Sequence, residues 1–137
     1  MKQIIIPTAE QIVLLNKLIC EKEGNTHHCY GKGKIESALH SAFYPGSYPF
    51  EHGGIAKVAG AMCFYLVKSH AFVDGNKRTG ALAAITFMNQ SGWTLKYPRA
   101  TQTEPNALAD IVEKCASGSI QKEKIIEWFD SHKVATK

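Results

Sequence analysis

Two segments of the chain, residues 53–69 and 79–90, carry apolar side chains at the three- and four-residue spacing of an α-helix. In the first segment the apolar positions extend almost all the way round the predicted helix, with small glycine and alanine residues between them. A helix of this kind must be buried on most sides, so other helices have to surround it. The two segments therefore predict a helical fold around a central pair of helices.

The N-terminal part of the chain predicts two further helices. The first begins at a capping box of Thr8 and Gln11 and ends near Gly24. Its expected apolar face contains Ile12, Leu14, Leu15, Leu18 and Ile19. A polar loop is expected at residues 25–33, followed by a second helix at residues 34–43.

The C-terminal part predicts two more helices. Thr103 is expected to cap a helix that ends at Cys115, with Pro105 in its first turn. The last helix is anchored by Ile125, Ile126 and Phe129. Residues 93–95 favour a brief extended piece, and the polar tail after Ser131 is expected to be frayed.

Residues 44–50 interrupt this helical pattern with two prolines, a glycine and three aromatic residues. Such a sequence favours an extended or hairpin-like excursion. No internal repeat or interdomain linker is visible. We therefore expect an all-α fold, a compact bundle of about six helices with one short hairpin-like loop, in a single domain over residues 1–137.

Composition excludes several classes of protein. The formal net charge of +4 on 137 residues is too small to indicate nucleic-acid binding, and no stripe of cations alternates with aromatic residues. No apolar run approaches the roughly 20 residues that cross a bilayer. Three isoleucines before Pro7 do not fit a secretion signal, so we expect a cytoplasmic protein with no membrane partner.

The cysteines do not form a metal or disulfide pattern. Cys20, Cys29, Cys63 and Cys115 are widely spaced and contain no CxxC pair, which favours reduced thiols. The sequence His27-His28-Cys29 raises a metal hypothesis. Because no fourth ligand lies at a useful spacing, a polar loop is the favoured interpretation.

The polar stretch between the two central helices, residues 70–80, reads His-Ala-Phe-Val-Asp-Gly-Asn-Lys-Arg-Thr-Gly. Lys77 and Arg78 fall at the start of a helix, where the dipole disfavours cations unless an anion is bound. Gly75 and Asn76 tolerate positive φ, so backbone amides and both cations can surround a phosphate group.

Asp74 and His70 complete this constellation. One carboxylate with phosphate oxygens is a usual way to hold Mg²⁺, and an imidazole is suited to remove a proton from a hydroxyl at neutral pH. Phe72 is expected to pin the loop to the core. Taken singly, these residues have simpler explanations: an Asp-Gly turn, a histidine at a helix end, a solvated Lys-Arg pair. Taken together, they predict a magnesium-nucleotide site.

The pattern His-x-Phe-x-Asp-Gly-Asn-Lys-Arg-Thr resembles the signature of the Fic/Doc superfamily, in the variant carried by Doc (death-on-curing) toxins. The similarity extends to residues 33–39, 44–45, 59–68, 81–92 and 108–119, and so covers most of the chain. The resemblance implies an all-α fold with a β-hairpin flap.

The resemblance also implies a role for each residue of the motif. His70 would be the general base, Asp74 would bind Mg²⁺, and Arg78 would clasp phosphate of ATP. The anion-binding turn would consist of Gly75, Asn76 and Lys77. The flap would line up a target segment by strand addition, and it would consist of Tyr48, Pro49, Phe50 and Glu51.

Lys77 selects between two reactions of the superfamily. Typical Fic enzymes have glycine at this position and transfer AMP, whereas Doc-type enzymes with lysine resemble kinases in which the γ-phosphate faces the hydroxyl. We therefore expect phosphoryl transfer from ATP to a Thr or Ser of a translation factor similar to elongation factor Tu, which would inhibit translation. AMP transfer, and a catalytically inactive member that only binds a partner, remain alternatives.

Such a toxin requires restraint. Some Fic proteins carry an inhibitory motif, Ser/Thr-x-x-x-Glu-Gly/Asn, whose nearest match here is Glu23-Gly24. Ile19 occupies the position that needs a hydroxyl. We therefore expect a separate antitoxin protein, whose helix would cover a groove near Arg78.

Overall fold

The computed structural model describes residues 5–44, 54–98 and 106–136. These residues form six helices and one two-stranded sheet, in the order α1 (Ala9–Glu23), α2 (Lys32–Phe43), α3 (Ile55–Ser69), α4 (Asn76–Gln90), β1 (Trp93–Leu95), α5 (Ala107–Ser117), α6 (Lys122–Ser131) and β2 (Lys133–Ala135). The prediction of an all-α bundle is confirmed. The predicted hairpin-like loop, including Tyr48, Pro49, Phe50 and Glu51, lies outside the described residues.

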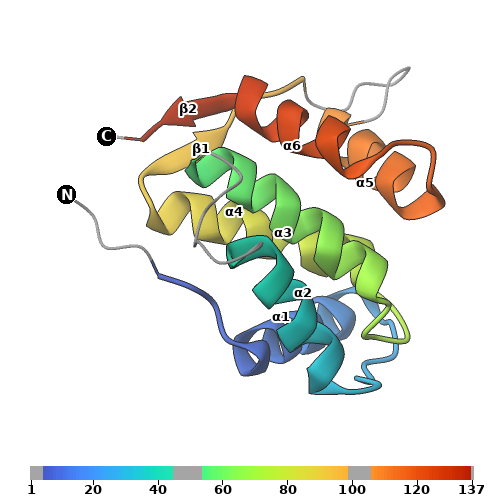
Figure 1. Cartoon of the computed structure of the whole chain (residues 1–137). Coiled ribbons are helices and arrows are strands. Elements are labelled where there is room, and N and C mark those ends of the chain that lie inside the picture. The colour runs from blue at the N-terminus through green and yellow to red at the C-terminus, as the bar shows by residue number, and fades with distance from the viewer. Residues whose placement is uncertain (1–4, 45–53, 99–105, 137) are drawn as a thin grey trace.

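Helix α3 is the centre of the bundle, as its all-round apolar pattern predicts. Figure 1 shows α3 between α1 and α2 on one side and α5 and α6 on the other. Helix α4 packs along α3 so closely that a Cβ on Gly80 would lie 2.8 Å from the side chain of Val67. A larger residue at position 80 would therefore push apart the two helices that flank the polar loop.

Helix α1 begins and ends as the sequence predicts. Thr8 and Gln11 form the capping box, and Gly24 ends the helix in the left-handed conformation with φ 72°. Leu14 and Leu18, which were expected on the buried face, are 54% and 55% exposed. The face that packs against the core passes through Ile12, Asn16, Ile19 and Cys20 instead.

The start of α5 differs from the prediction. The helix begins at Ala107, and its cap is Asn106, whose side-chain oxygen accepts from the N–H groups of Leu108 and Ala109. Thr103 is therefore not the cap, and both Thr103 and Pro105 lie outside the described residues. An asparagine cap satisfies two N–H groups of the first turn, which otherwise have no partner in the helix.

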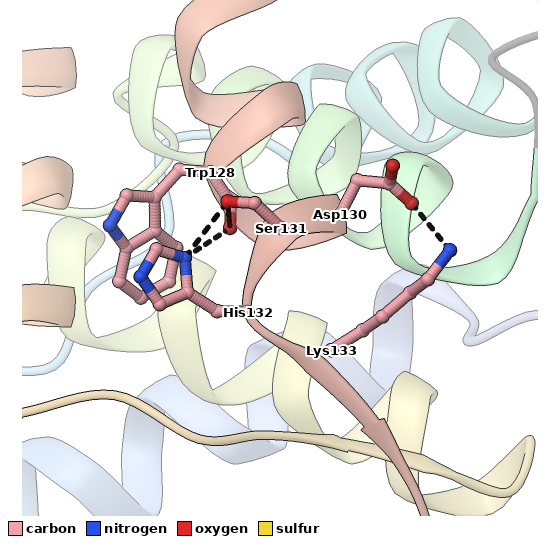
Figure 2. A network of polar contacts seen from close by, with 5 residues as sticks. All are labelled: Trp128, Asp130, Ser131, His132 and Lys133. Atoms are coloured by element: carbon pink, nitrogen blue, oxygen red, sulfur yellow. Dashed lines mark hydrogen bonds and ion pairs between the residues drawn. The ribbon is translucent and has the colours of Figure 1, made fainter.

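The prediction of a frayed C-terminal tail is wrong. Residues Lys133–Ala135 form β2, which pairs antiparallel with β1 so that Thr94 faces Val134. The turn from α6 into β2 is held by a local network (Figure 2), in which the His132 ring stacks on Trp128 and its Nδ1 lies 2.7 Å from the Trp128 carbonyl oxygen. An ion pair between Lys133 and Asp130 continues this network.

Within the described residues, no helix combines the length and the apolar character that crossing a membrane requires. Cys20, Cys63 and Cys115 are buried, as their apolar neighbours predict, and desolvation raises the pKa of the Cys63 thiol above its usual range.

Candidate functional site

The polar loop joins the C-terminus of α3 to the N-terminus of α4. His70 ends α3 with φ 50°, the one positive φ of a non-glycine residue in the described ranges. Its side chain is exposed to solvent, whereas Ala71 and Phe72 are buried in the core. The prediction that Phe72 pins the loop is confirmed, and the pin leaves the histidine at the surface.

The segment that contains the two neighbouring histidines lies beside this loop. The Tyr30 N–H donates to the Ala71 carbonyl at 2.8 Å, and the Val73 N–H donates to the His28 carbonyl at 3.0 Å. Cys29 and Phe72 thus form an isolated antiparallel bridge. Although expected only as a polar loop, this segment holds the backbone of the candidate catalytic loop in place.

Asn76 closes the loop from the other end. Its Oδ1 accepts from the Phe72 N–H at 3.1 Å, and its Nδ2 donates to the Phe72 carbonyl at 2.7 Å. These two bonds join the first residue of α4 to the buried pin. The Asn76 side chain therefore fixes the loop. The backbone N–H of Asn76, like the other N–H groups of the first turn, has no acceptor within the helix and points along the helix axis.

The N-terminus of α4 has the features of an anion site. Gly75 is the N-cap, in the left-handed conformation with φ 79°, and it provides no side chain to cap the helix. The first turn contains Lys77 and Arg78 and no acidic residue. Uncapped N–H groups, the positive end of the helix dipole and two cations together favour a negatively charged ligand.

Both cations already have partners on other helices. Lys77 Nζ lies 2.7 Å from Glu113 Oε2 of α5, and Arg78 Nη1 lies 2.7 Å from Glu23 Oε2 at the end of α1. All four side chains are partly exposed, so each pair contributes only about 0–1 kcal/mol to stability. A phosphate group can replace such carboxylates at small cost.

These residues border a groove between α4 and α5 with a volume of about 800 Å³, which lies in the range of small-molecule sites. Its polar end consists of Gly75, Asn76, Lys77 and Arg78 with the two carboxylates. Its apolar wall consists of Ala81, Leu82, Ile85, Leu108 and Val112. The groove thus offers charge at one end and an apolar surface at the other.

Two predicted site residues of the loop, His70 and Asp74, do not border this groove. Asp74 is exposed, and its Oδ2 accepts from the Thr26 N–H at 3.3 Å. No cluster of three or more His, Cys, Asp or Glu side chains in the described ranges is arranged to hold a metal. One exposed carboxylate fits an ion such as Mg²⁺, which takes most of its ligands from water and phosphate.

Sequence reasoning missed several residues that contact the site. Glu23 and Glu113 pair with the cations, and Asn16 of α1 donates to the Asp74 carbonyl at 2.9 Å. Asn16 carries a signal in the sequence, because it is an amide on the helix face that also presents Ile12 and Ile19. Glu113 carries none, since ordinary surface helices contain many such residues. Glu23 stands out in the sequence only as the nearest match to the inhibitory motif, which does not indicate its ion pair with Arg78.

Comparison with protein-family models identifies a similarity over more than half of the chain. A sequence profile described as the Fic/DOC family matches residues 7–88, which run from the start of α1 through most of α4 and include the whole loop. A search of curated proteins found no match.

Proposed function

The chain belongs to the Fic/DOC family, and from this premise we propose that it is a Doc-type protein kinase, which transfers the γ-phosphate of ATP to a Thr or Ser hydroxyl of another protein. Members of the family are typically protein-modifying transferases that use ATP with Mg²⁺. The observation that carries the proposal is the first turn of α4, where Lys77 and Arg78 border the groove beside an uncapped helix N-terminus.

The roles of the residues follow from their positions on the loop. His70, exposed at the end of α3, takes the proton of the incoming hydroxyl while the hydroxyl oxygen attacks the γ-phosphorus. The bond from that phosphorus to the bridging oxygen breaks, and ADP leaves. Arg78 and the N–H groups of the first turn of α4 bind the oxygens of the transferred phosphoryl group. They contribute mainly by positioning this group and by neutralising its negative charge.

The exposed carboxylate of Asp74 would hold Mg²⁺ together with phosphate oxygens, and the ion would neutralise charge on the polyphosphate. Asp74 itself is fixed through its backbone carbonyl and through the Thr26 N–H. Its contribution is thus a carboxylate held in a defined position before the nucleotide arrives.

Lys77 supports γ-phosphate transfer over AMP transfer. Its side chain reaches from α4 to Glu113 on α5 and so lies across the polar end of the groove. An AMP transferase must seat the α-phosphate in the turn at the start of α4, where a lysine adds both volume and charge. The acceptor we propose is a hydroxyl of a translation factor, and the restraint we propose is a separate antitoxin.

The test is transfer of label from ATP to proteins of a cell extract, with the label on either the α- or the γ-phosphorus. The proposal predicts that only γ label is transferred, and that the His70→Ala variant transfers neither. Transfer of α label alone would assign AMP transfer instead. Absence of both labels, together with no binding of Mg-ATP in calorimetry, would assign a member that only binds a partner.

Lys77→Gly sharpens this test. If the lysine determines how ATP lies in the groove, removing it lowers the transfer of γ label and allows transfer of α label. Lys96→Gly is a matched control, because Lys96 is also an exposed lysine but does not border the groove. Equal effects of the two substitutions would remove Lys77 from the choice of reaction.

A further inference from the structure

Asn16 is one of two buried polar residues in the described part of the chain, and the other, Thr79, is its direct partner. The Asn16 side chain comes from α1, and its Nδ2 donates to the Asp74 carbonyl at 2.9 Å and to Thr79 Oγ1 at 3.0 Å. A single amide therefore connects the last turn of the loop with the first turn of α4.

The orientation of this amide follows from its partners. The Asp74 carbonyl can only accept, so the atom that faces it must be the nitrogen of Asn16. The Asn16 oxygen consequently faces His27 Nδ1, at 2.8 Å, and this ring nitrogen must carry the hydrogen. The His27 N–H therefore donates to the oxygen end of the amide and stabilises the orientation that places the nitrogen toward the loop.

Gly75 shows how closely the loop rests on the amide. A Cβ at this position would lie 2.9 Å from Asn16 Nδ2. The backbone of residues 74–75 therefore lies directly on Asn16. The side chains of Asp74, Lys77 and Arg78 are exposed instead. Asn16 supports the backbone that carries these side chains and contacts none of them through their charged groups.

The segment that carries His27 contacts the loop at a second place. Its backbone forms the bridge to Ala71 and Val73, and the ring of His27 lies 6.2 Å from the ring of Phe72. One short segment thus holds the loop through its main chain and orients the amide through a side chain.

We propose that Asn16 and His27 are positioning residues for the reaction: the His27 ring orients the Asn16 amide, and the amide fixes the backbone from which Asp74, Lys77 and Arg78 reach the nucleotide. This inference rests on the proposed function for its kinetic consequence. Its structural consequence does not rest on the proposed function: without the His27 ring, the backbone of residues 71–79 should open locally more often.

The substitutions that test it are His27→Ala, His27→Asn and His28→Ala. Alanine removes the imidazole donor to the Asn16 oxygen and leaves only the weaker Cys20 thiol at 3.6 Å, whereas asparagine places an amide nitrogen where the ring has Nδ1. His28 is the matched control, because it is exposed, its ring contacts Tyr30 rather than the amide, and alanine keeps its backbone bond to Val73. Asn16→Asp, which replaces the Nδ2 donor by a carboxylate oxygen that can only accept, is expected to have a larger effect but risks loss of the fold.

We expect His27→Ala to lower kcat for phosphoryl transfer about tenfold, since small displacements of reacting groups slow catalysis. KM for ATP is expected to stay within about twofold, because the groups that bind the phosphates remain. His27→Asn should restore most of kcat, and His28→Ala should behave as the unmodified protein. Equal kcat values for His27→Ala and His28→Ala would overturn the inference.

Hydrogen exchange separates this inference from the proposed function. Amides of residues 71–79 should exchange faster in His27→Ala, and His27→Asn should restore their protection. Amides of α6 serve as a reference for global stability and should not change. If the unmodified protein transfers no label, the proposed function fails, and the exchange data still decide on His27: equal protection of residues 71–79 in His27→Ala and His28→Ala overturns its role.

Discussion

The loop between α3 and α4 rests on buried and partly buried hydrogen bonds on its inner side, whereas its outer side carries exposed polar and charged groups, two of them in ion pairs. We call inner face the contacts of Asn16 with Asp74 and Thr79 and of Asn76 with Phe72. We call outer face the exposed side chains of His70, Asp74, Lys77 and Arg78.

The difference teaches which part of the site is rigid and which part can exchange partners. A buried donor or acceptor that loses its partner costs about 1–3 kcal/mol, so the inner face resists rearrangement. An exposed ion pair contributes about 0–1 kcal/mol, so Glu23 and Glu113 can be displaced. The loop thus combines a fixed backbone with side chains that are free to take a ligand. Substitutions on the inner face should affect stability and the position of the loop, whereas substitutions on the outer face should affect activity with little change in stability.

The largest expected effect is on the outer face, at His70. We expect His70→Asn to lower phosphate transfer by about 10²- to 10⁴-fold, because the variant has no imidazole to take the proton. Asparagine tolerates the positive φ of this position, so the free energy of unfolding should change by less than about 0.5 kcal/mol. Transfer of label from ATP and urea denaturation measure the two quantities. A variant with normal turnover would remove His70 from the mechanism.

The next effect is on the inner face, at Gly75. We expect Gly75→Ala to destabilise the protein by about 2–3 kcal/mol, because alanine is strained at φ 79° and its Cβ would lie 2.9 Å from Asn16 Nδ2. Gly24→Ala is the matched control, since Gly24 has φ 72° and open space around it. The control should cost only about 1 kcal/mol in urea denaturation. Equal costs would show that the loop does not rest on Asn16.

Features of the fold that depend on residues close together in the sequence could be predicted, whereas features that depend on contacts between distant parts of the chain could not. The helices follow from local periodicity, and their ends differ from the prediction by a few residues at Lys32, Asn76 and Ala107. Strand β2 could not be foreseen. Its three residues are all exposed and show no alternation, and its partner β1 lies near residue 94, far away in the chain.

The residues of the site likewise divide into those that the sequence indicates and those that only the packing of the helices brings together. The residues of the outer face lie together in the sequence, so their spacing alone is enough to indicate an anion site. The partners Glu23 and Glu113 come from α1 and α5, and only the packing of those helices brings them to Lys77 and Arg78. Asn16 is intermediate, because a polar residue on an apolar face signals a buried bond without naming its partner.

A third prediction compares two neighbouring residues. Asn76→Ala removes both bonds to Phe72 and is expected to cost about 1–2 kcal/mol of stability. Lys77→Ala removes an exposed ion pair and should cost less than about 0.5 kcal/mol. Thermal or urea denaturation of both variants measures the contrast. If Lys77→Ala were the more destabilising of the two, the assignment of these residues to inner and outer faces would be wrong.

The smallest expected effect concerns the two carboxylates that form ion pairs with Lys77 and Arg78. ATP must displace Glu23 from Arg78, so Glu23→Gln should tighten the binding of Mg-ATP by about two- to fivefold, the equivalent of one exposed ion pair. Glu113→Gln should give a smaller gain, because Glu113 and Lys77 are both more than half exposed, whereas Glu23 is 31% exposed. Calorimetric titration at low and high salt measures both, and the gains should shrink as salt screens the ion pairs. Weaker binding in Glu23→Gln would mean that the carboxylate orients Arg78 for phosphate rather than competing with it, and the outer face would then be as preorganised as the inner one.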